Sequence, residues 1–321
     1  MANDPGLAAD TCTFMEAVSG DGGTHNVNSA WWLSPDIQLT GPTSGPDKAD
    51  PGAANTVDVT LHNRAGNCRL PPGTESITLE LWMGNPSLAM APNIAASTVH
   101  IDSIGMTIFG LGATATHQFT WTPPTGVPAS DPQAPGHKCL IARCYADPLT
   151  PSASSFFAPD DPHVAQHNIC IVPCGGPGAV RRPHTCGIDV TTINPDVKKG
   201  QTVKWRAVLD LEPKKFVHDV VLERLRKTKG FDRLAKKAPR GFTLRLADGT
   251  KAKLTDRTKP SGTRVPRFEA DVRLRAAQVV RFAFIADLSD AALGEAYIFH
   301  LTQVGANRRP QGGLTVVVLA V

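Results

Sequence analysis

The stretch NTVDVTLHNR, residues 55–64, alternates apolar and polar side chains at every second position. Its apolar positions are Val57, Val59 and Leu61. Successive side chains of a β-strand point to opposite faces, so this spacing predicts a half-buried strand. The next stretch, ESITLELWMGNP at residues 75–86, repeats the pattern. The fold is therefore expected to be built from strands with one buried face.

Short strands of this kind are expected along the whole first half of the chain. The other candidates are residues 36–40, 98–104, 117–122, 138–144 and 164–172. Turns rich in Pro or Gly separate them, in a sequence with 28 Gly and 27 Pro among 321 residues. Seven or eight short strands in about 140 residues predict a β-sandwich with Greek-key connections.

Residues 135–148, PGHKCLIARCYADP, place a histidine and two cysteines close together in the sequence. If this stretch is a strand, Leu140 and Cys144 share one face, and Cys139 and Ile141 share the other. The two cysteines then point apart and cannot bridge each other or bind one metal ion. The stretch is therefore interpreted as a sandwich strand.

A second β-rich unit is expected after a linker rich in Pro and Gly. The predicted division is a leader (1–30), an acidic sandwich (31–172), a linker (173–187) and a basic sandwich (188–321). Strands of the second unit are expected at residues 242–246, 267–274, 279–286, 297–304 and 314–321. The predicted fold class is all-β, with two immunoglobulin-like β-sandwich domains.

One segment of the second unit departs from the strand pattern. Val217, Val221 and Leu225 repeat at i, i+4 and i+8, and Gly230 follows them. This spacing favours a short helical insertion near residues 214–237, although DVVLERL also fits a strand.

The net charge of +4 conceals an uneven distribution. Residues 1–183 contain 7 Lys and Arg against 15 Asp and Glu, whereas residues 184–321 contain 26 against 14.

The densest group of cations is Lys214, Lys215, Arg224, Arg226, Lys227, Lys229, Arg233, Lys236, Lys237 and Arg240. Such a group attracts anions, and three interpretations are open: a solvated face, an acidic protein partner, or a polyanion. The acidic first domain of a neighbouring copy is one candidate partner. Only Phe216 and Phe231 interleave the cations, so nucleic acid is disfavoured.

Seven cysteines allow at most three intramolecular disulfides. The candidates for pairing are Cys12, Cys68, Cys170, Cys174 and Cys186. A zinc site formed by Cys170, Cys174, His184 and Cys186 is the alternative, but its spacing departs from that of zinc fingers.

The sequence contains two further groups of potential metal ligands. His163 and His167 are four residues apart on an expected strand, a separation of about 13 Å that is too long for one ion. The expected loops carry Asp47, Asp50, Asp147, Asp160 and Asp161, which could bind calcium. Their spacing matches no calcium-loop motif, which favours solvated carboxylates, and no metal or cofactor is predicted.

Four segments carry a family resemblance. They are WWLSPDIQL, NTVDVTLHNR, PGHKCLIARC and DDPHVAQHNICIV, in this order over about residues 31–172. Together they resemble the bacterial cell-adhesion-related modules called CARDB domains. The resemblance implies a seven-stranded, immunoglobulin-like sandwich that acts as a spacer or binding module, and it implies no catalytic residues.

The functional hypotheses follow from these patterns. The sequence has no G-x-S-x-G elbow, H-E-x-x-H pair or glycine-rich phosphate loop. The leading hypothesis is a non-enzymatic structural or binding module, as a decoration, fibre or spacer component of a bacterial surface, secreted or phage-like assembly. The alternatives are a hydrolase or metal-dependent enzyme with its site at the domain junction, and a polyanion-binding protein.

The location is less constrained. No stretch is long and apolar enough to span a membrane, and no signal-peptide pattern is recognisable. The cysteine content favours a secreted or particle-associated location over a cytoplasmic one.

Overall fold

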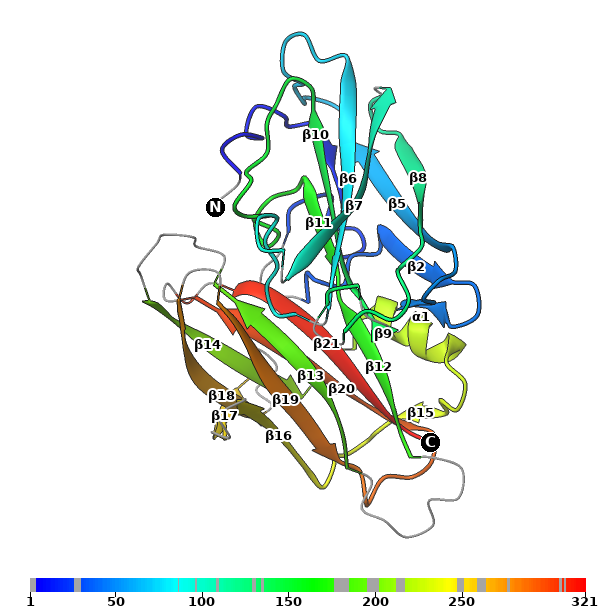
Figure 1. Ribbon diagram of the computed structural model, residues 1–321, viewed down its shortest axis with the longest axis vertical. Coiled ribbons are helices and arrows are strands. Elements are labelled where there is room, and N and C mark those ends of the chain that lie inside the picture. The colour runs from blue at the N-terminus through cyan, green and yellow to red at the C-terminus, as the bar shows by residue number, and fades with distance from the viewer. Residues whose placement is uncertain are drawn as a thin grey trace.

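The chain forms an all-β structure with one short helix, α1. The computed structural model describes residues 4–25, 30–85, 87–95, 97–107, 110–128, 131–133, 136–175, 185–194, 202–211, 217–246, 251–258, 264–275, 278–305, 308 and 310–321. Figure 1 shows two stacks of strands, one above the other along the long axis, with α1 beside their junction. Among the described residues, no helix is long and apolar enough to cross a bilayer.

The upper stack is a sandwich of two antiparallel sheets. In the first sheet β5 (Asn55–Asn63) lies between β8 (Thr114–Trp121) and the strands β1 (Thr13–Phe14) and β2 (Ile37–Gly41), and β2 also pairs with β3 (Gly45–Pro46). The second sheet has the order β11 (Val164–His167), β10 (Cys139–Ala146), β6 (Ser76–Gly84), β7 (Thr98–Thr107). A separate ribbon joins β4 (Lys48–Ala49) to β9 (Gly136–His137).

The alternating pattern of residues 55–64 sets the core of this sandwich, as predicted. Val57, Val59 and Leu61 are fully buried between the sheets, where they meet Ile77, Leu79 and Leu81 of β6. Leu140 and Cys144 of β10 belong to this core, whereas Cys139 and Ile141 face a second cluster. The predicted opposite orientation of the two cysteines is confirmed.

The lower stack is a second sandwich. Its larger sheet has the order β12 (Ile169–Cys174), β21 (Pro310–Ala320), β20 (Glu295–Val304), β14 (Thr202–Leu211), β18 (Arg264–Arg275), β17 (Lys253–Thr258), with β15 (Arg233–Leu234) also paired with β20. The smaller sheet has the order β13 (Thr185–Ile193), β19 (Val279–Asp287), β16 (Gly241–Leu246). Phe282, Phe284 and Phe299 fill the space between them.

The predicted strand at residues 164–172 is wrong as a single element. β11 pairs with β10 of the first sandwich, whereas β12 pairs in parallel with β21 of the second. Asn168 alone separates the two strands. The boundary predicted at residue 172 therefore falls inside β12, and the predicted linker overlaps the end of β12 and the start of β13.

The helical insertion is confirmed, and α1 spans Asp219–Lys227. The His218 ring accepts the Val220 N–H at the N-terminus, and the backbone N–H of Thr228 donates to the Leu225 carbonyl at the other end. Val221 and Leu225 are buried, as their spacing predicts. The helix is shorter than residues 214–237, and residues 212–216 lie outside the described part of the chain.

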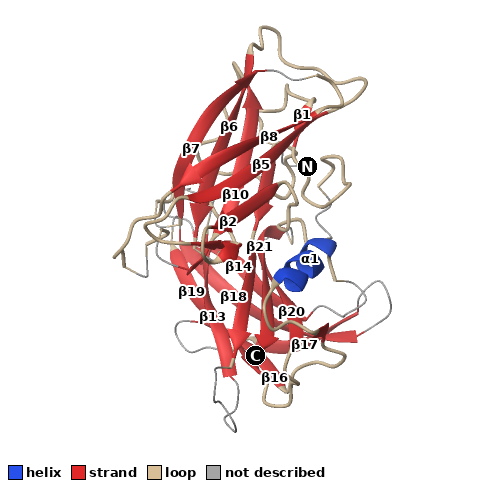
Figure 2. Ribbon diagram, turned by 90° about the vertical axis from the view of Figure 1, so that its right-hand side faces the viewer, coloured by secondary structure: helices blue, strands red, loops and turns tan. Residues whose placement is uncertain are grey.

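The apolar cluster that contains Cys139 and Ile141 lies where the two sandwiches meet. It unites Trp31, Trp32 and Leu33, which precede β2, with Val221 and Leu225 of α1. From the larger sheet of the second sandwich it includes Ile298, Val317 and Leu319. Figure 2 shows α1 at the level where the two stacks meet. The helix therefore packs into the junction between the two domains.

Two glycines of β21 allow close packing across this junction. A Cβ atom on Gly312 would overlap the Leu88 carbonyl, and one on Gly313 would overlap the Trp32 ring. Gly312→Ala or Gly313→Ala should therefore lower the free energy of unfolding by about 1–3 kcal/mol, the usual cost of overpacking. Urea unfolding measures this change. The control is Gly105→Ala in β7, where an added Cβ meets no atom within 4 Å; an equal loss there would contradict the packing argument.

Candidate functional site

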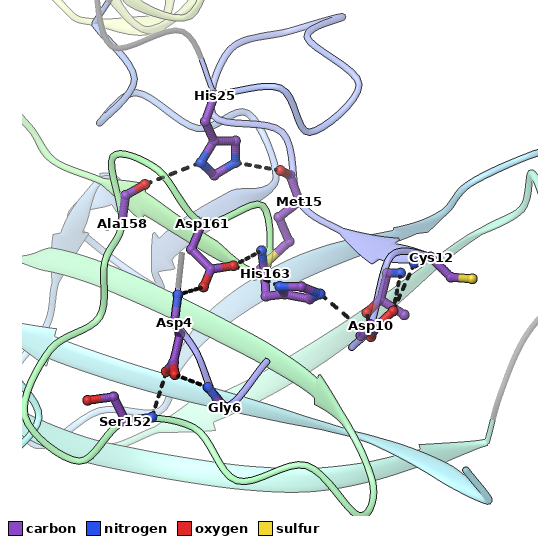
Figure 3. Close-up of polar contacts among 11 residues, drawn as sticks. Asp4, Gly6, Asp10, Cys12, Met15, His25, Ser152, Ala158, Asp161 and His163 are labelled. Carbon is purple, nitrogen blue, oxygen red and sulfur yellow. Dashed lines mark hydrogen bonds and ion pairs between the residues drawn. The ribbon is translucent and has the colours of Figure 1, made fainter. Parts of the chain in front are cut away.

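A cavity of about 210 Å³ lies between the N-terminal segment and the first sandwich. One wall is formed by Asp161, Pro162 and His163, just before β11. The other lining residues are Leu7, Ala8, Asp10, Thr11, Thr13 and Arg64. Figure 3 shows the side chains that meet beside it. They include a histidine flanked by two carboxylates, an arrangement that also occurs in catalytic sites.

The imidazole of His163 lies between Asp161 and Asp10. Its Nδ1 is 2.7 Å from Asp161 Oδ1, and its Nε2 is 3.6 Å from Asp10 Oδ2. All three residues are at most 3% exposed. Burial opposes the charge of Asp161, but hydrogen bonds from the His163 ring and backbone and from the Asp4 backbone outweigh it and lower its pKa. An ionised Asp161 accepts a hydrogen bond from the Nδ1–H group of His163. The other ring nitrogen, Nε2, then faces Asp10.

The carboxylates of this cluster bind backbone N–H groups of the N-terminal segment. Asp161 Oδ2 accepts the Asp4 N–H at 2.8 Å, and Asp4 in turn accepts N–H groups from Gly6 and Ser152 at 2.9 and 2.6 Å. Asp10 Oδ1 accepts the N–H of Cys12 at 2.8 Å (Figure 3). The segment predicted as a leader is thus fixed to the sandwich and supplies strand β1.

No nucleophile in the described residues is paired with His163. The Thr13 hydroxyl donates to Asp10, so its proton is not directed at the imidazole. Cys144 lies close by, but burial and the charges of Asp10 and Asp161 raise the pKa of its thiol well above the ordinary value. The arrangement therefore fits a clamp on the N-terminal segment better than a hydrolytic triad.

A second buried polar group spans the junction between the domains. Asp47 Oδ1 is 2.9 Å from His167 Nε2, and Asp47 Oδ2 is 3.1 Å from Arg224 Nε of α1. The other ring nitrogen of His167 bonds to the Ser34 carbonyl at 2.9 Å. Burial opposes the charge of Asp47, but His167 and Arg224 prevail and lower its pKa. Sequence reasoning missed this contact, because Asp47 and Arg224 lie far apart in the chain.

Several cations of the predicted patch form ion pairs with carboxylates of the same chain. Arg224 is only 11% exposed at its side chain and holds Asp47. Lys227 pairs with Glu223 at 2.7 Å, Arg233 with Glu295 at 3.1 Å, and Arg240 with Asp287 at 4.0 Å. Four exposed cations of the predicted patch make no ion pair among the described residues: Arg226, Lys229, Lys236 and Lys237. Lys214 and Lys215 lie outside the described part of the chain.

Several carboxylates of the acidic first half are buried. The buried carboxylates are Asp4, Asp10, Asp36, Asp47 and Asp161. The interpretation of Asp47 and Asp161 as solvated loop residues is therefore wrong, because each accepts several hydrogen bonds or ion pairs. Asp50 accepts the N–H groups of Thr43 and Ser44, and Asp147 accepts the Ser76 hydroxyl. One local signal for such contacts is present in the sequence. An aspartate side chain can accept the backbone N–H of the residue two positions later, as Asp10 does from Cys12.

The cysteines form two disulfides in the described chain. Cys12 is joined to Cys68 and Cys174 to Cys186, whereas Cys139, Cys144 and Cys170 are buried thiols. Burial raises the pKa of Cys170 to about 12. The Cys174–Cys186 bond uses two ligands of the alternative zinc site, and His184 lies outside the described residues. In the described part, no group of three or more His, Cys, Asp or Glu could hold a metal ion.

The sequence matches no protein-family model and no curated protein. Among solved structures, it is similar to the B domain of a biofilm-associated protein, with 8% identity over 99% of this chain and 86% of that one and a TM-score of 0.28. It is also similar to the collagen adhesin of S. aureus, with 8% identity over 89% and 93% of the chains and a TM-score of 0.22.

A family 123 glycoside hydrolase from Clostridium perfringens is 7% identical over 48% of this chain, with a TM-score of 0.23. This chain covers 23% of that enzyme. These neighbours identify neither a family nor an activity.

The pKa directions predict an acid-sensitive first sandwich. The pKa of Asp161 lies below its ordinary value of 3.8. Its contribution to stability is therefore complete above the unfolded-state pKa and is lost as the pH falls through the folded-state value. Asp161→Asn should lower the free energy of unfolding at pH 7 by about 2–4 kcal/mol and flatten its decline below about pH 4. Urea titrations across pH measure both effects. Glu75→Gln, at an exposed acid, should change neither, and a steep decline retained by Asp161→Asn would contradict the assignment.

Proposed function

We propose that the chain is a non-enzymatic structural module in which two sandwiches act as one rigid body. It would serve as a spacer, fibre or decoration element of a bacterial surface, secreted or phage-like assembly, with a first sandwich of the CARDB type. The observation that carries the proposal is the junction, where a shared apolar core surrounds the buried amide of Asn168. The two disulfides support an oxidising, extracytoplasmic location.

Asn168 bonds to four separate segments of the chain. Its backbone N–H donates to the Trp32 carbonyl at 2.9 Å, and its carbonyl accepts the Thr315 N–H at 2.9 Å. The side-chain Nδ2 donates to the carbonyls of Ser87 and Gly313 at 2.8 and 2.6 Å. The Cys139 thiol donates to Oδ1. A buried amide with all of its groups bonded fixes the segments it joins.

Two further contacts strengthen the junction. The Trp32 indole N–H donates to the Thr315 hydroxyl at 2.9 Å, and its ring meets His300 edge-on, with 5.7 Å between the ring centroids. Arg224 joins α1 to Asp47. Domains within one chain usually move relative to each other unless their interface is large and apolar. The apolar cluster together with these polar bonds therefore favours a rigid rod.

The exposed cations in the last turn of α1 and after it favour an acidic protein partner. Arg226, Lys229, Lys236 and Lys237 are exposed, and their side chains would meet a negative surface without losing an ion pair of the described residues. The first sandwich of a neighbouring copy fits less well, because several of its carboxylates are buried. We therefore favour a different acidic protein as the partner.

The rigidity of the junction is directly testable. The full chain should unfold in one calorimetric transition, because unfolding either sandwich would expose the shared core. Asn168→Ala should separate this transition into two and broaden the interdomain distances measured by small-angle X-ray scattering. Asn67→Ala, in an exposed loop, should leave both measurements unchanged. Two independent transitions in the unmodified chain would refute the single rigid body.

The partner surface can be tested with polyglutamate as an acidic probe. The chain should bind immobilised polyglutamate at low salt, and replacing Lys229, Lys236 and Lys237 together by Glu should reduce retention at least tenfold. Lys236→Glu alone, which changes the net charge by the same amount as Lys204→Glu, should reduce retention more than that control, because Lys204 pairs with Asp271 at 2.8 Å. Equal losses in the two single variants would indicate a general charge effect and not a binding surface.

A further inference from the structure

Lys138 is a buried cation with an amide as its neighbour. It directly precedes β10 and is 2% exposed. Its Nζ donates to Asn85 Oδ1 at 2.9 Å and to the Pro132 carbonyl at 2.8 Å. No ion pair of the described residues includes it. A lysine is rarely buried without a carboxylate, so this amine calls for an explanation.

The fold holds the two side chains together. Asn85 directly follows β6, and β6 pairs with β10 in a register that places Gly84 opposite Cys139. Lys138 and Asn85 are therefore the next cross-strand positions. The Asn85 amide is fixed at both ends, because its Nδ2 donates to the Asp131 carbonyl at 2.8 Å. Its carbonyl group thus faces the Lys138 amine, and its nitrogen faces away.

Burial also prepares the amine as a nucleophile. It lowers the pKa of Lys138 to about 8, although the charge of Asp131 acts in the opposite direction. Roughly one tenth of such amines are neutral at pH 7, compared with fewer than one in a thousand for an ordinary lysine. Holding a neutral amine against a carbonyl group removes most of the entropic cost of their reaction.

We propose that Lys138 and Asn85 form an intramolecular isopeptide bond. The Nζ atom attacks Cγ of Asn85, a new C–N bond forms, and the bond from Cγ to Nδ2 breaks. One proton passes from the attacking nitrogen to the departing nitrogen, which leaves as ammonia. Atoms and charges balance without an oxidant, a metal or a cofactor. Asp131 lies beside both groups, because its backbone carbonyl accepts the Asn85 Nδ2–H and its charge acts on the Lys138 amine.

The bond would lie at the junction end of the first sandwich. Cys139, the residue after Lys138, accepts the Ser87 N–H and donates to Asn168. The bond would close the chain between Asn85 and Lys138 into a loop that contains β7 and β8. Tension applied to the two ends of the chain could not extend this loop. This inference goes beyond the proposed function, because the bond can form whether or not the chain is a spacer.

A competing reaction of asparagine is suppressed at this position. Asparagine can also lose ammonia when the next backbone N–H attacks its side chain and forms a succinimide. Asn85 is followed by Pro86, which has no backbone N–H. The loss of ammonia at Asn85 would therefore point to the Lys138 amine.

Mass spectrometry of the full chain, reduced and denatured, tests the bond. The expected mass is lower than the sequence mass by one ammonia, and a proteolytic digest should yield one branched peptide containing both residues. Lys138→Arg and Asn85→Ala should restore the sequence mass, whereas Lys204→Arg should keep the deficit. The wild-type digest decides the matter even where a variant fails to fold. After prolonged incubation at pH 8, recovery of Lys138 and Asn85 in separate peptides at full mass would overturn the proposal.

Discussion

The arrangement of the two domains depends on one buried amide. The chain leaves a sheet of the first sandwich at His167 and enters a sheet of the second at Ile169. Asn168, the residue between them, is 0% exposed, so the two strands are not joined by a solvated turn. Its polar groups must therefore all be bonded inside the protein. An asparagine provides a second amide beside that of the backbone, and here both amides bond to segments of the two sandwiches.

Aspartates play a related role in the long connections of the first sandwich. A sandwich of about 140 residues with short strands must satisfy many backbone N–H groups outside its sheets. Asp4, Asp10, Asp21 and Asp161 each accept N–H groups of loops or of the N-terminal segment. The negative charge of the first half suggested an acidic surface. Part of this charge belongs instead to aspartates that bind the backbone of loops. Charge counted along a sequence therefore overestimates the charge that a partner would meet.

The sequence predicted those elements in which a local pattern decides the structure. Alternation identified β5 and β6, and the spacing of Val221 and Leu225 identified α1. The break at Asn168 was not predicted, because residues 164–172, VAQHNICIV, contain neither Gly nor Pro to mark the end of a strand. The ion pair of Asp47 with Arg224 and the clamp of Asp10, Asp161 and His163 depend on contacts between distant segments, which local patterns do not encode.

One signal of the junction was nevertheless present in the sequence. Residues 314–320 of β21, LTVVVLA, do not alternate, and a strand without alternation is buried on both faces. Val316 and Val318 enter the core of the second sandwich, whereas Val317 and Leu319 enter the junction cluster. The second sandwich alone would expose that outer row to water together with Ile298. An exposed apolar row favours association, so the first sandwich covers this face of the second, which supports the proposal that the two act as one rigid body.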